Sequence, residues 1–312
     1  MNLLISSIGS LSAKFIIEEC KSLNVNIFGT DINEEKYLIN AKKINAFYKT
    51  TKSINSSQYF TEITEIIKER GITHIIPLTD LDVDFFSEYY HHFEPHKVKI
   101  LVENQDLISI LRNKERVYDF FKDNKIISCI PTYNLSSFLS SCNQYPAIGK
   151  IKNGRSSENL FCIENEKYLA LIDETYIIQP RIPGDIITVD IISDRRNSVW
   201  IQRREIFRTK NGAGITVEIL NNSNINNVIK EFLLVTNYFG VLNIEFIIND
   251  HKVYLMDVNP RFSAGVAFSN FAGYNFATNA MKLLQGEPIA TLDILIPEGL
   301  ILSREYQEKI IN

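Results

Sequence analysis

Three side chains with oxygen donors lie in residues 240–261 at a spacing that suits a metal ion. The segment holds two apolar runs joined by a polar turn, which predicts a β-hairpin. Glu245 interrupts the first run, while Asp257 and Asn259 lie two residues apart in the second and so point to one face. Antiparallel pairing across the short turn brings Glu245 opposite them. Carboxylate and amide oxygens suit Mg²⁺, and a neighbouring arginine, Arg261, suits a phosphate.

A hairpin with a polar rim is the alternative, because acidic residues are common at strand ends. However, two carboxylates and an amide on otherwise apolar strands are costly to bury unless a cation pairs with them. The joint pattern therefore favours the metal site.

The same hairpin carries a resemblance to a known family. The stretch Asn243-Ile244-Glu245, followed by Met256-Asp257-Val258-Asn259-Pro260-Arg261-Phe262, resembles the metal-binding signature of ATP-grasp ligases. The branch that it most resembles includes carbamoyl-phosphate synthase and the amino-acid ligases. The resemblance implies that Glu245, Asp257 and Asn259 hold Mg²⁺, with Mn²⁺ as an alternative ion. It also implies that Arg261 is catalytic and stabilises an anionic intermediate.

Two lysines match positions that contact the nucleotide phosphates in that family. Lys114 lies in a stretch similar to the family's lysine-bearing helix, with Asn113 in place of the usual aspartate; the residues alone favour a solvated lysine there. Lys150 ends an apolar strand and precedes a Gly/Ser loop, whose backbone N–H groups can contact phosphate oxygens. The alternative is a surface hairpin with a polar tip. The resemblance to the family's mobile flap implies that ATP is also bound by loop residues: Gly154, Arg155, Ser156 and Ser157.

Residues 176–185 resemble the family's hinge, where backbone groups contact adenine. Pro180 replaces the usual acidic residue, and Ile186 replaces the usual ribose-binding glutamate. The resemblance assigns ATP-binding roles here to four residues: Gln179, Arg181, Ile182 and Asp185.

Arg203 and Arg204 form a basic pair after the next predicted strand. A solvated pair is the alternative to an anion site. The family commonly has an arginine near the acyl-phosphate here, and the resemblance favours Arg204 as catalytic.

The N-terminal region predicts a Rossmann-like strand–helix–strand unit. A short apolar strand ends at Gly9, a helix follows over residues 12–23, and a second strand ends at Asp31, which is a candidate substrate contact. The glycine fingerprint is absent between them, which excludes dinucleotide binding and an NAD-dependent enzyme. Residues 79–82 follow a buried strand, and we expect them to line the acceptor site because ligands gather at the carboxyl ends of strands.

The sequence predicts an α/β protein with α+β grasp lobes. Residues 106–124 predict one helix that begins at Asp106. We expect a Rossmann-like pre-ATP-grasp domain over residues 1–104 and a two-lobed ATP-grasp domain over residues 105–290. The small lid lobe of the second domain would cover about 115–182 and its large lobe about 183–290. Residues 291–312 would form a C-terminal tail.

Composition excludes several classes of protein. The net charge of −4 gives no general attraction to nucleic acid or anionic membranes, and no apolar run is long enough to span a bilayer. The four cysteines form no CxxC pair, which argues against a zinc site and a disulfide framework. The chain starts directly in a predicted strand and not in a signal peptide, so we expect a cytoplasmic protein.

These features predict an ATP-dependent ligase that joins a small carboxylate to an amine through an acyl-phosphate, releasing ADP and phosphate. Amino acids are candidate substrates, and the resemblance makes a homodimer an option. The alternative is a catalytically silent, nucleotide-binding homologue that acts as a regulatory or scaffold subunit, which the altered hinge favours and the intact metal triad opposes.

Overall fold

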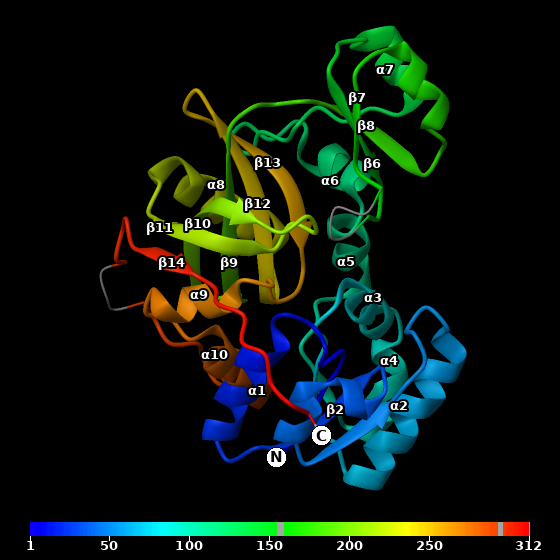
Figure 1. Cartoon of the computed structure of the whole chain (residues 1–312), viewed down its shortest axis with the longest axis vertical. Coiled ribbons are helices and arrows are strands. Elements are labelled where there is room, and N and C mark those ends of the chain that lie inside the picture. Colours follow the sequence, from blue (N-terminus) through cyan, green and yellow to red (C-terminus); the bar gives the residue numbers. More distant parts are fainter. Residues whose placement is uncertain (155–158, 293–295, 312) are drawn as a thin grey trace.

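The computed structural model describes residues 1–154, 159–292 and 296–311 and contains three β-sheets (Figure 1). One sheet is parallel, and the other two are antiparallel. The predicted α/β class, with α+β lobes, is confirmed. Among the described residues, no helix is long and apolar enough to cross a membrane.

The parallel sheet lies at the bottom of Figure 1 and has five strands in the order β3-β2-β1-β4-β5. Its strands are β1 (Asn2–Ile5), β2 (Asn26–Asp31), β3 (Ala46–Lys49), β4 (His74–Ile76) and β5 (Lys99–Ile100). Its helices are α1 (Ala13–Ser22), α2 (Ser56–Arg70), α3 (Asp80–Glu88) and α4 (Tyr90–Phe93), with 3₁₀ turns at Glu35–Tyr37, Ile39–Lys43 and Glu94–His96. The chain leaves β1 toward β2 on one side and returns to β4 on the other, so the carboxyl ends of these three strands surround a switch point.

Alternation along β1 explains why both faces of this sheet are covered. Leu3 and Ile5 belong to the hydrophobic core that also contains α1, whereas Leu4 belongs to the core beneath α2 and α3. This is the period of two that a strand buried on both faces must satisfy.

Two short helices, α5 (Gln105–Leu111) and α6 (Lys114–Phe121), lead from the parallel sheet to the upper lobe (Figure 1). The single helix predicted over residues 106–124 is therefore wrong. The side chain of Asn113 accepts hydrogen bonds from the N–H groups of Glu115 and Arg116, at 3.1 and 3.0 Å, and so caps a new helix. Asn104 caps the first helix in the same way, in place of Asp106.

The upper lobe is a small three-stranded sheet in the order β7-β6-β8. Its elements are α7 (Leu135–Ser141), β6 (Ala147–Ile151), β7 (Phe161–Ile163), a 3₁₀ helix at Glu166–Leu171 and β8 (Tyr176–Pro180). Phe138, Ala147 and Ile178 form part of a core that belongs to this lobe alone.

The third sheet has six antiparallel strands in the order β13-β12-β9-β10-β11-β14. Its strands are β9 (Asp185–Asp194), β10 (Ser198–Arg208), β11 (Gly214–Leu220), β12 (Phe239–Asn249), β13 (Lys252–Asn259) and β14 (Ile301–Ser303). Its helices are α8 (Ser223–Thr236), α9 (Val266–Phe271) and α10 (Phe276–Gln285). The segment after residue 290, which carries no sequence signal, thus supplies the edge strand β14 beside β11.

The parallel sheet and the six-stranded sheet share one hydrophobic core. Ile5 and Ile16 of the N-terminal region pack in the same cluster as Ile192 of β9 and Phe276 of α10. By contrast, the small lobe has a hydrophobic core of its own. The two larger parts therefore form one platform, and the small lobe stands on it (Figure 1).

Candidate functional site

The hairpin of β12 and β13 has the register that the sequence predicts. Glu245 lies opposite Asp257, and Asn243 lies opposite Asn259. Because residues directly opposite in an antiparallel pair share a face, all four side chains point to the same side of the sheet. They line a cavity of about 350 Å³.

The oxygens on this face fit a hard divalent cation. Among the described residues, no group of three or more His, Cys, Asp and Glu side chains is placed to hold a metal. The set formed by Glu245, Asp257 and Asn259 has two carboxylates and one amide, which is a donor set that Mg²⁺ accepts when water and phosphate complete its octahedron. Their assignment as metal ligands stays a prediction.

Both carboxylates of this set are paired with cations. The ammonium of Lys114 lies 3.1 Å from Asp257, and the guanidinium of Arg208 contacts Glu245. Burial raises the pKa of Glu245, and Arg208 opposes that shift. The negative charge that a metal ion would balance is therefore balanced by two side chains of the protein.

The nucleotide-binding lysines predicted from the sequence converge on the hairpin from the small lobe and α6. Nζ of Lys114 also donates to the carbonyl of Gly154 at 3.0 Å, which places Gly154 beside it. Burial lowers the pKa of Lys150; Asp257 and Glu245 oppose this effect, and Lys114 adds to it. Arg155, Ser156 and Ser157 lie outside the described residues.

The predicted hinge adjoins a small cavity between the lobes. Gln179 is buried and donates from Nε2 to Thr132 at 2.9 Å, while its Oε1 has no partner. Cys129, Leu255 and Met256 also line this cavity. The N–H of Arg181 donates to the carbonyl of Pro146, at 3.2 Å, so it is engaged within the lobe, and Ile182 follows it half-buried.

The structure does not bring Arg204 or Asp185 to the cavity at the hairpin, although Asp185 lies opposite Ile248 of β12. These two residues pair with each other at 3.2 Å, and Arg204 also pairs with Glu218 of β11. Neither lines the cavity at the hairpin, whereas Arg203, on the opposite face of β10, does. The catalytic role of Arg204 stays a prediction, and its side chain lies outside the hairpin cavity.

Three charged residues of β10 line the hairpin cavity, and the sequence analysis assigned none of them: Arg203, Glu205 and Arg208. Arg203 and Glu205 lie two residues apart and share a face. Arg208 joins them because the register of β10 against β11 shifts on either side of Phe207, which turns Phe207 toward solvent. Such irregularities re-aim side chains beside active sites. The periodicity of β10 alone could not reveal this shift.

Arg203 is held in place by several partners. It contacts Asp190, donates to Ser263 at 3.0 Å, and lies 3.3 Å from Glu205. Burial by itself would lower the pKa of Arg203, but Asp190 and Glu205 outweigh burial and raise it. A permanently charged guanidinium thus faces the cavity.

Arg261 links the hairpin to the parallel sheet. Its Nε and Nη2 atoms each lie 3.0 Å from an oxygen of Asp80, at the start of α3. Asp80 also lies 3.4 Å from Arg112. Burial would raise the pKa of Asp80, but Arg261 and Arg112 lower it. The predicted catalytic arginine is therefore fixed by a buried carboxylate.

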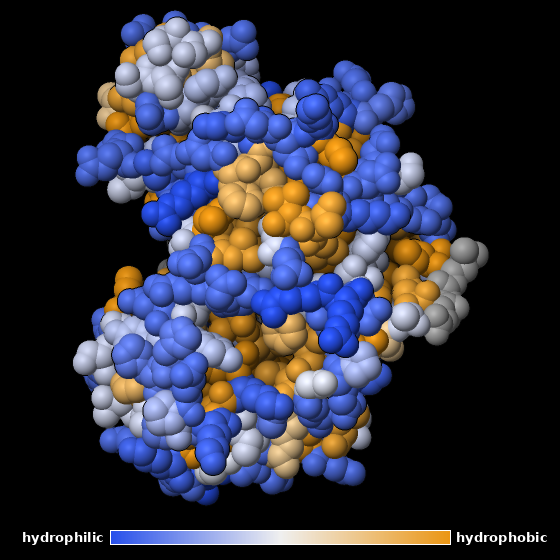
Figure 2. All heavy atoms as spheres, turned by 180° about the vertical axis from the view of Figure 1, so that it is seen from behind, coloured by the Kyte–Doolittle hydropathy of each residue, from blue (hydrophilic) through white to orange (hydrophobic). Residues whose placement is uncertain are grey.

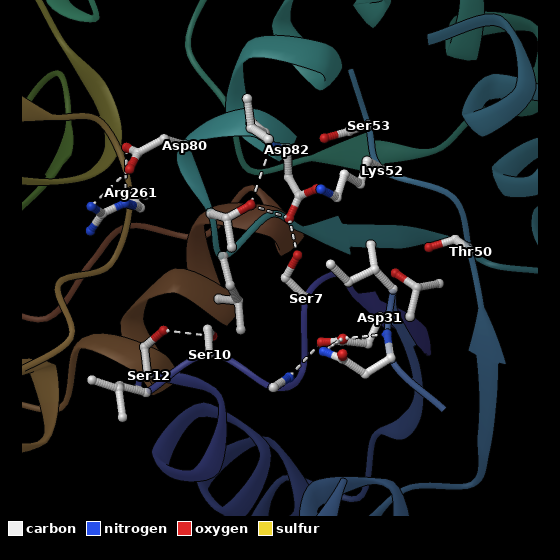
Figure 3. A pocket seen from close by; sticks show the side chains of 18 of the residues that line it. Ser7, Ser10, Ser12, Asp31, Thr50, Lys52, Ser53, Asp80, Asp82 and Arg261 are labelled. Carbon is white, nitrogen blue, oxygen red and sulfur yellow. Dashed lines mark hydrogen bonds and ion pairs between the residues drawn. The ribbon is translucent and has the colours of Figure 1, made fainter. Parts of the chain in front are cut away.

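A second cavity, of about 530 Å³, lies at the carboxyl ends of β1, β2 and β4 (Figure 3). Asp82 accepts hydrogen bonds there from Ser6, Ser7 and Thr79, while Asp31 accepts one from the N–H of Gly9 at 2.8 Å. Both carboxylates therefore tie the surrounding loops together. The two cavities share Leu11, Arg261 and Ala264 in their walls. Residues 79–82 line this second cavity, and their role as a wall of the acceptor site stays a prediction.

Hydrophobic side chains are also visible on the far side of the molecule. In Figure 2 they form one patch above and one below a hydrophilic band that crosses the face.

Comparison with known proteins identifies the fold. Residues 173–299 match the model of a family described as ATP-grasp in the biosynthetic pathway with Ter operon. The chain has the ATP-grasp fold. The resemblance seen in the sequence is thereby confirmed, and the matched residues include the whole hairpin.

One curated relative is the arginine-specific large chain of carbamoyl phosphate synthase from Halalkalibacterium halodurans. It is 23% identical over 282 residues, which cover 82% of this chain and 26% of that protein. The chain therefore spans about a quarter of the relative that it matches.

Solved structures with the same fold include biotin carboxylase from Campylobacter jejuni and an L-amino acid ligase from Bacillus licheniformis. The first has a TM-score of 0.74 at 15% identity and covers 93% of this chain and 72% of its own. The second has a TM-score of 0.72 at 13% identity and covers 91% and 74%.

Proposed function

We propose that this ATP-grasp protein is an ATP-dependent ligase, which joins a small carboxylate to an amine through an acyl-phosphate and releases ADP and phosphate. The observation that carries the proposal is the charged face of the hairpin. Two carboxylates and an amide lie there beside two lysines and three arginines, around a cavity large enough for the reacting groups. The relatives named for carboxylation, carbamoyl-phosphate synthesis and amino-acid ligation support the same reaction class.

The basic residues and the oxygen-donor residues of the site have different roles in the proposed reaction. Lys114 and Lys150 would bind phosphate oxygens from the small-lobe side, because both ammonium groups face Asp257 and its neighbours. Glu245, Asp257 and Asn259 would hold Mg²⁺, which supplies charge neutralisation on the transferred phosphate when bound. Positioning and electrostatic stabilisation then account for most of the rate, because phosphoryl transfer requires no covalent residue from the protein.

The arginines suit the anions that form and leave. Arg203 and Arg261 are fixed by buried carboxylates, Asp190 and Asp80, so their guanidinium groups are preorganised before substrate arrives. A carboxylate substrate that attacks the γ-phosphate gives an acyl-phosphate, whose negative charge these groups would stabilise. An amine then attacks the acyl carbon, and phosphate leaves.

The test is phosphate release from Mg-ATP with pooled carboxylic acids and amines. We expect release that depends on an added acid in the wild type and a loss of at least about 100-fold in Asp257→Asn, since a ligand of the phosphate-bound ion is removed. Lys122→Met is the control, because Lys122 forms an exposed pair with Asp119 and does not line the hairpin cavity. Equal release by wild type and Asp257→Asn would reject the proposed site.

A nucleotide-binding protein without turnover is the second candidate. The hinge favours it, since Ile186 replaces a ribose ligand and the N–H of Arg181 is already bonded to Pro146. Calorimetry with Mg-ATP separates the two: binding with no acid-dependent phosphate release favours the silent homologue.

A further inference from the structure

Glu205 lines the hairpin cavity, but the proposed mechanism assigns it no role. Its side chain is 2% exposed, yet it lines the cavity together with Glu245 and Asp257. One of its oxygens, Oε1, lies 3.3 Å from Nε of Arg203. The other, Oε2, is buried and has no hydrogen-bond partner.

The charges around Glu205 do not balance. Asp190 and Glu205 both face a single guanidinium, that of Arg203, and Asp190 takes its Nη1 atom. Arg208, the other cation beside them, is occupied by Glu245. Among the described residues of this cluster, three carboxylates thus face two guanidinium groups. An excess negative charge in a buried cluster is costly, and a bound cation removes that cost.

The backbone is shaped to hold Glu205 in this orientation. A Cβ atom built on Gly214 would lie 2.3 Å from Oε2 of Glu205, and one built on Gly265 would lie 3.0 Å from Nη2 of Arg203. Glycine at both positions lets the two charged groups lie flat against the cavity wall. The carboxylate of Glu205 is therefore held in a buried position that the backbone leaves open for it, and it is not a solvated side chain on a strand.

We propose that Glu205 binds the ammonium group of the amine substrate and so selects a cationic amine as the acceptor. This inference rests on the proposed function, because it assigns the second substrate of the same site. A carboxylate substrate is repelled by Glu205 and attracted by Arg203 and Arg261, so charge separates the two substrates within one cavity. The bound ammonium loses one proton to solvent, and the neutral nitrogen attacks the acyl carbon. The bond between that carbon and the phosphate oxygen then breaks, and phosphate leaves with the second proton of the nitrogen.

Two kinds of nucleophile, cationic and neutral, distinguish this role from a structural one. Ammonium, glycine and L-lysine are cationic at nitrogen near neutral pH, whereas hydroxylamine is neutral at slightly alkaline pH and traps acyl-phosphates as hydroxamates. We expect Glu205→Gln to raise KM for the cationic amines by about 10- to 100-fold, the range for loss of a charged hydrogen bond. Hydroxamate formation and KM for Mg-ATP and the carboxylate are expected to stay within about twofold.

A second variant keeps the charge and moves it. Gly214→Ala forces Oε2 of Glu205 away from its place, so it is expected to raise KM for the amines in the same direction. Glu205→Asp, which keeps a shorter carboxylate, is expected to fall between wild type and Glu205→Gln. Glu218→Gln is the matched control, because Glu218 pairs with Arg204 on the neighbouring strand and does not line the cavity.

Each result bears on one of the two proposals. If the wild type forms no hydroxamate with any acid tested, the ligase function is rejected and the role of Glu205 with it. If hydroxamate forms and Glu205→Gln keeps the wild-type KM for amines, only the role of Glu205 is overturned. Loss of one bound divalent ion from Glu205→Gln in a calorimetric titration with Mn²⁺ would also overturn it, since Glu205 would then be a metal ligand.

Discussion

The buried ammonium of Lys150 is unfavourable for folding, although the proposed function uses it to bind ATP. Its ammonium is buried beside Lys114, which disfavours the charged form, while Asp257 and Glu245 partly compensate. The net result is a lowered pKa. A group that binds its proton less tightly in the folded state than in the unfolded chain makes folding less favourable below the folded-state pKa, and this penalty disappears as pH rises to the ordinary value of 10.5.

We therefore expect Lys150→Met to be as stable as wild type at neutral pH, or more stable, while binding Mg-ATP about 10- to 100-fold less tightly. Thermal unfolding without ligand and calorimetry with Mg-ATP measure the two effects. Lys152→Met is the control, because Lys152 forms a partly exposed pair with Glu115, 2.8 Å away. A marked fall in melting temperature for Lys150→Met alone would contradict the buried-charge argument.

At the level of elements, the start of α6 positions Lys114. The cap by Asn113 fixes the first turn, and the N–H of Lys114 donates to the carbonyl of Lys152 at 3.0 Å, so the helix is joined to the end of β6. A loss of the cap should loosen the lysine as well as the helix.

We expect Asn113→Ala to lower the free energy of unfolding by about 1 kcal/mol and to weaken Mg-ATP binding as well. Asn134→Ala removes the equivalent cap of α7, whose Asn134 side chain accepts from Ser137 at 2.9 Å. That control should cost similar stability without changing nucleotide affinity. Equal affinities in the two variants would show that the cap does not position Lys114.

The sequence predicts these elements well when the interacting residues are close along the chain, and poorly when they are far apart. The pairing of Glu245 with Asp257 was predicted from alternation and a short turn, both local, but it also requires a register shift between Glu245 and Phe246 that alternation does not reveal. The break at Asn113 was missed because Arg112 and Asn113 also fit a charged helix face. The positions of Arg203, Glu205 and Arg208 depend on how β10 pairs with β11, and β14 depends on a partner far along the chain. Such pairings leave no periodic signal in one segment.

At the scale of the whole molecule, the pair of Asp80 and Arg261 joins the N-terminal region to the hairpin. Two guanidinium groups, of Arg112 and Arg261, converge on this one carboxylate. Because the pKa of Asp80 is lowered in the folded state, its contribution to stability is present above the unfolded-state pKa of about 3.9 and is lost as pH falls through the folded-state value.

We expect Asp80→Asn to lower the free energy of unfolding by about 3–5 kcal/mol at neutral pH, because Arg261 loses its carboxylate partner and the buried Arg112 loses one of its two, keeping Asp84. Urea unfolding at several pH values checks this, and the difference from wild type should shrink in acid. Asp119→Asn, at an exposed pair with Lys122, should cost less than about 1 kcal/mol. A difference that stays constant in acid would contradict the role of ionised Asp80.

The two cations that cover the hairpin carboxylates have a thermodynamic consequence. A divalent ion arriving alone must compete with Lys114 and Arg208 for Asp257 and Glu245, whereas a nucleotide offers those cations its phosphates. Ion and nucleotide should therefore bind with positive cooperativity, and each must raise the other's affinity by the same factor.

We expect a factor of about 5–150 between Mg²⁺ affinities measured with and without ADP. Arg208→Gln should strengthen the binding of Mg²⁺ alone and reduce this cooperativity, and an unchanged factor would mean that the guanidinium does not compete with the ion.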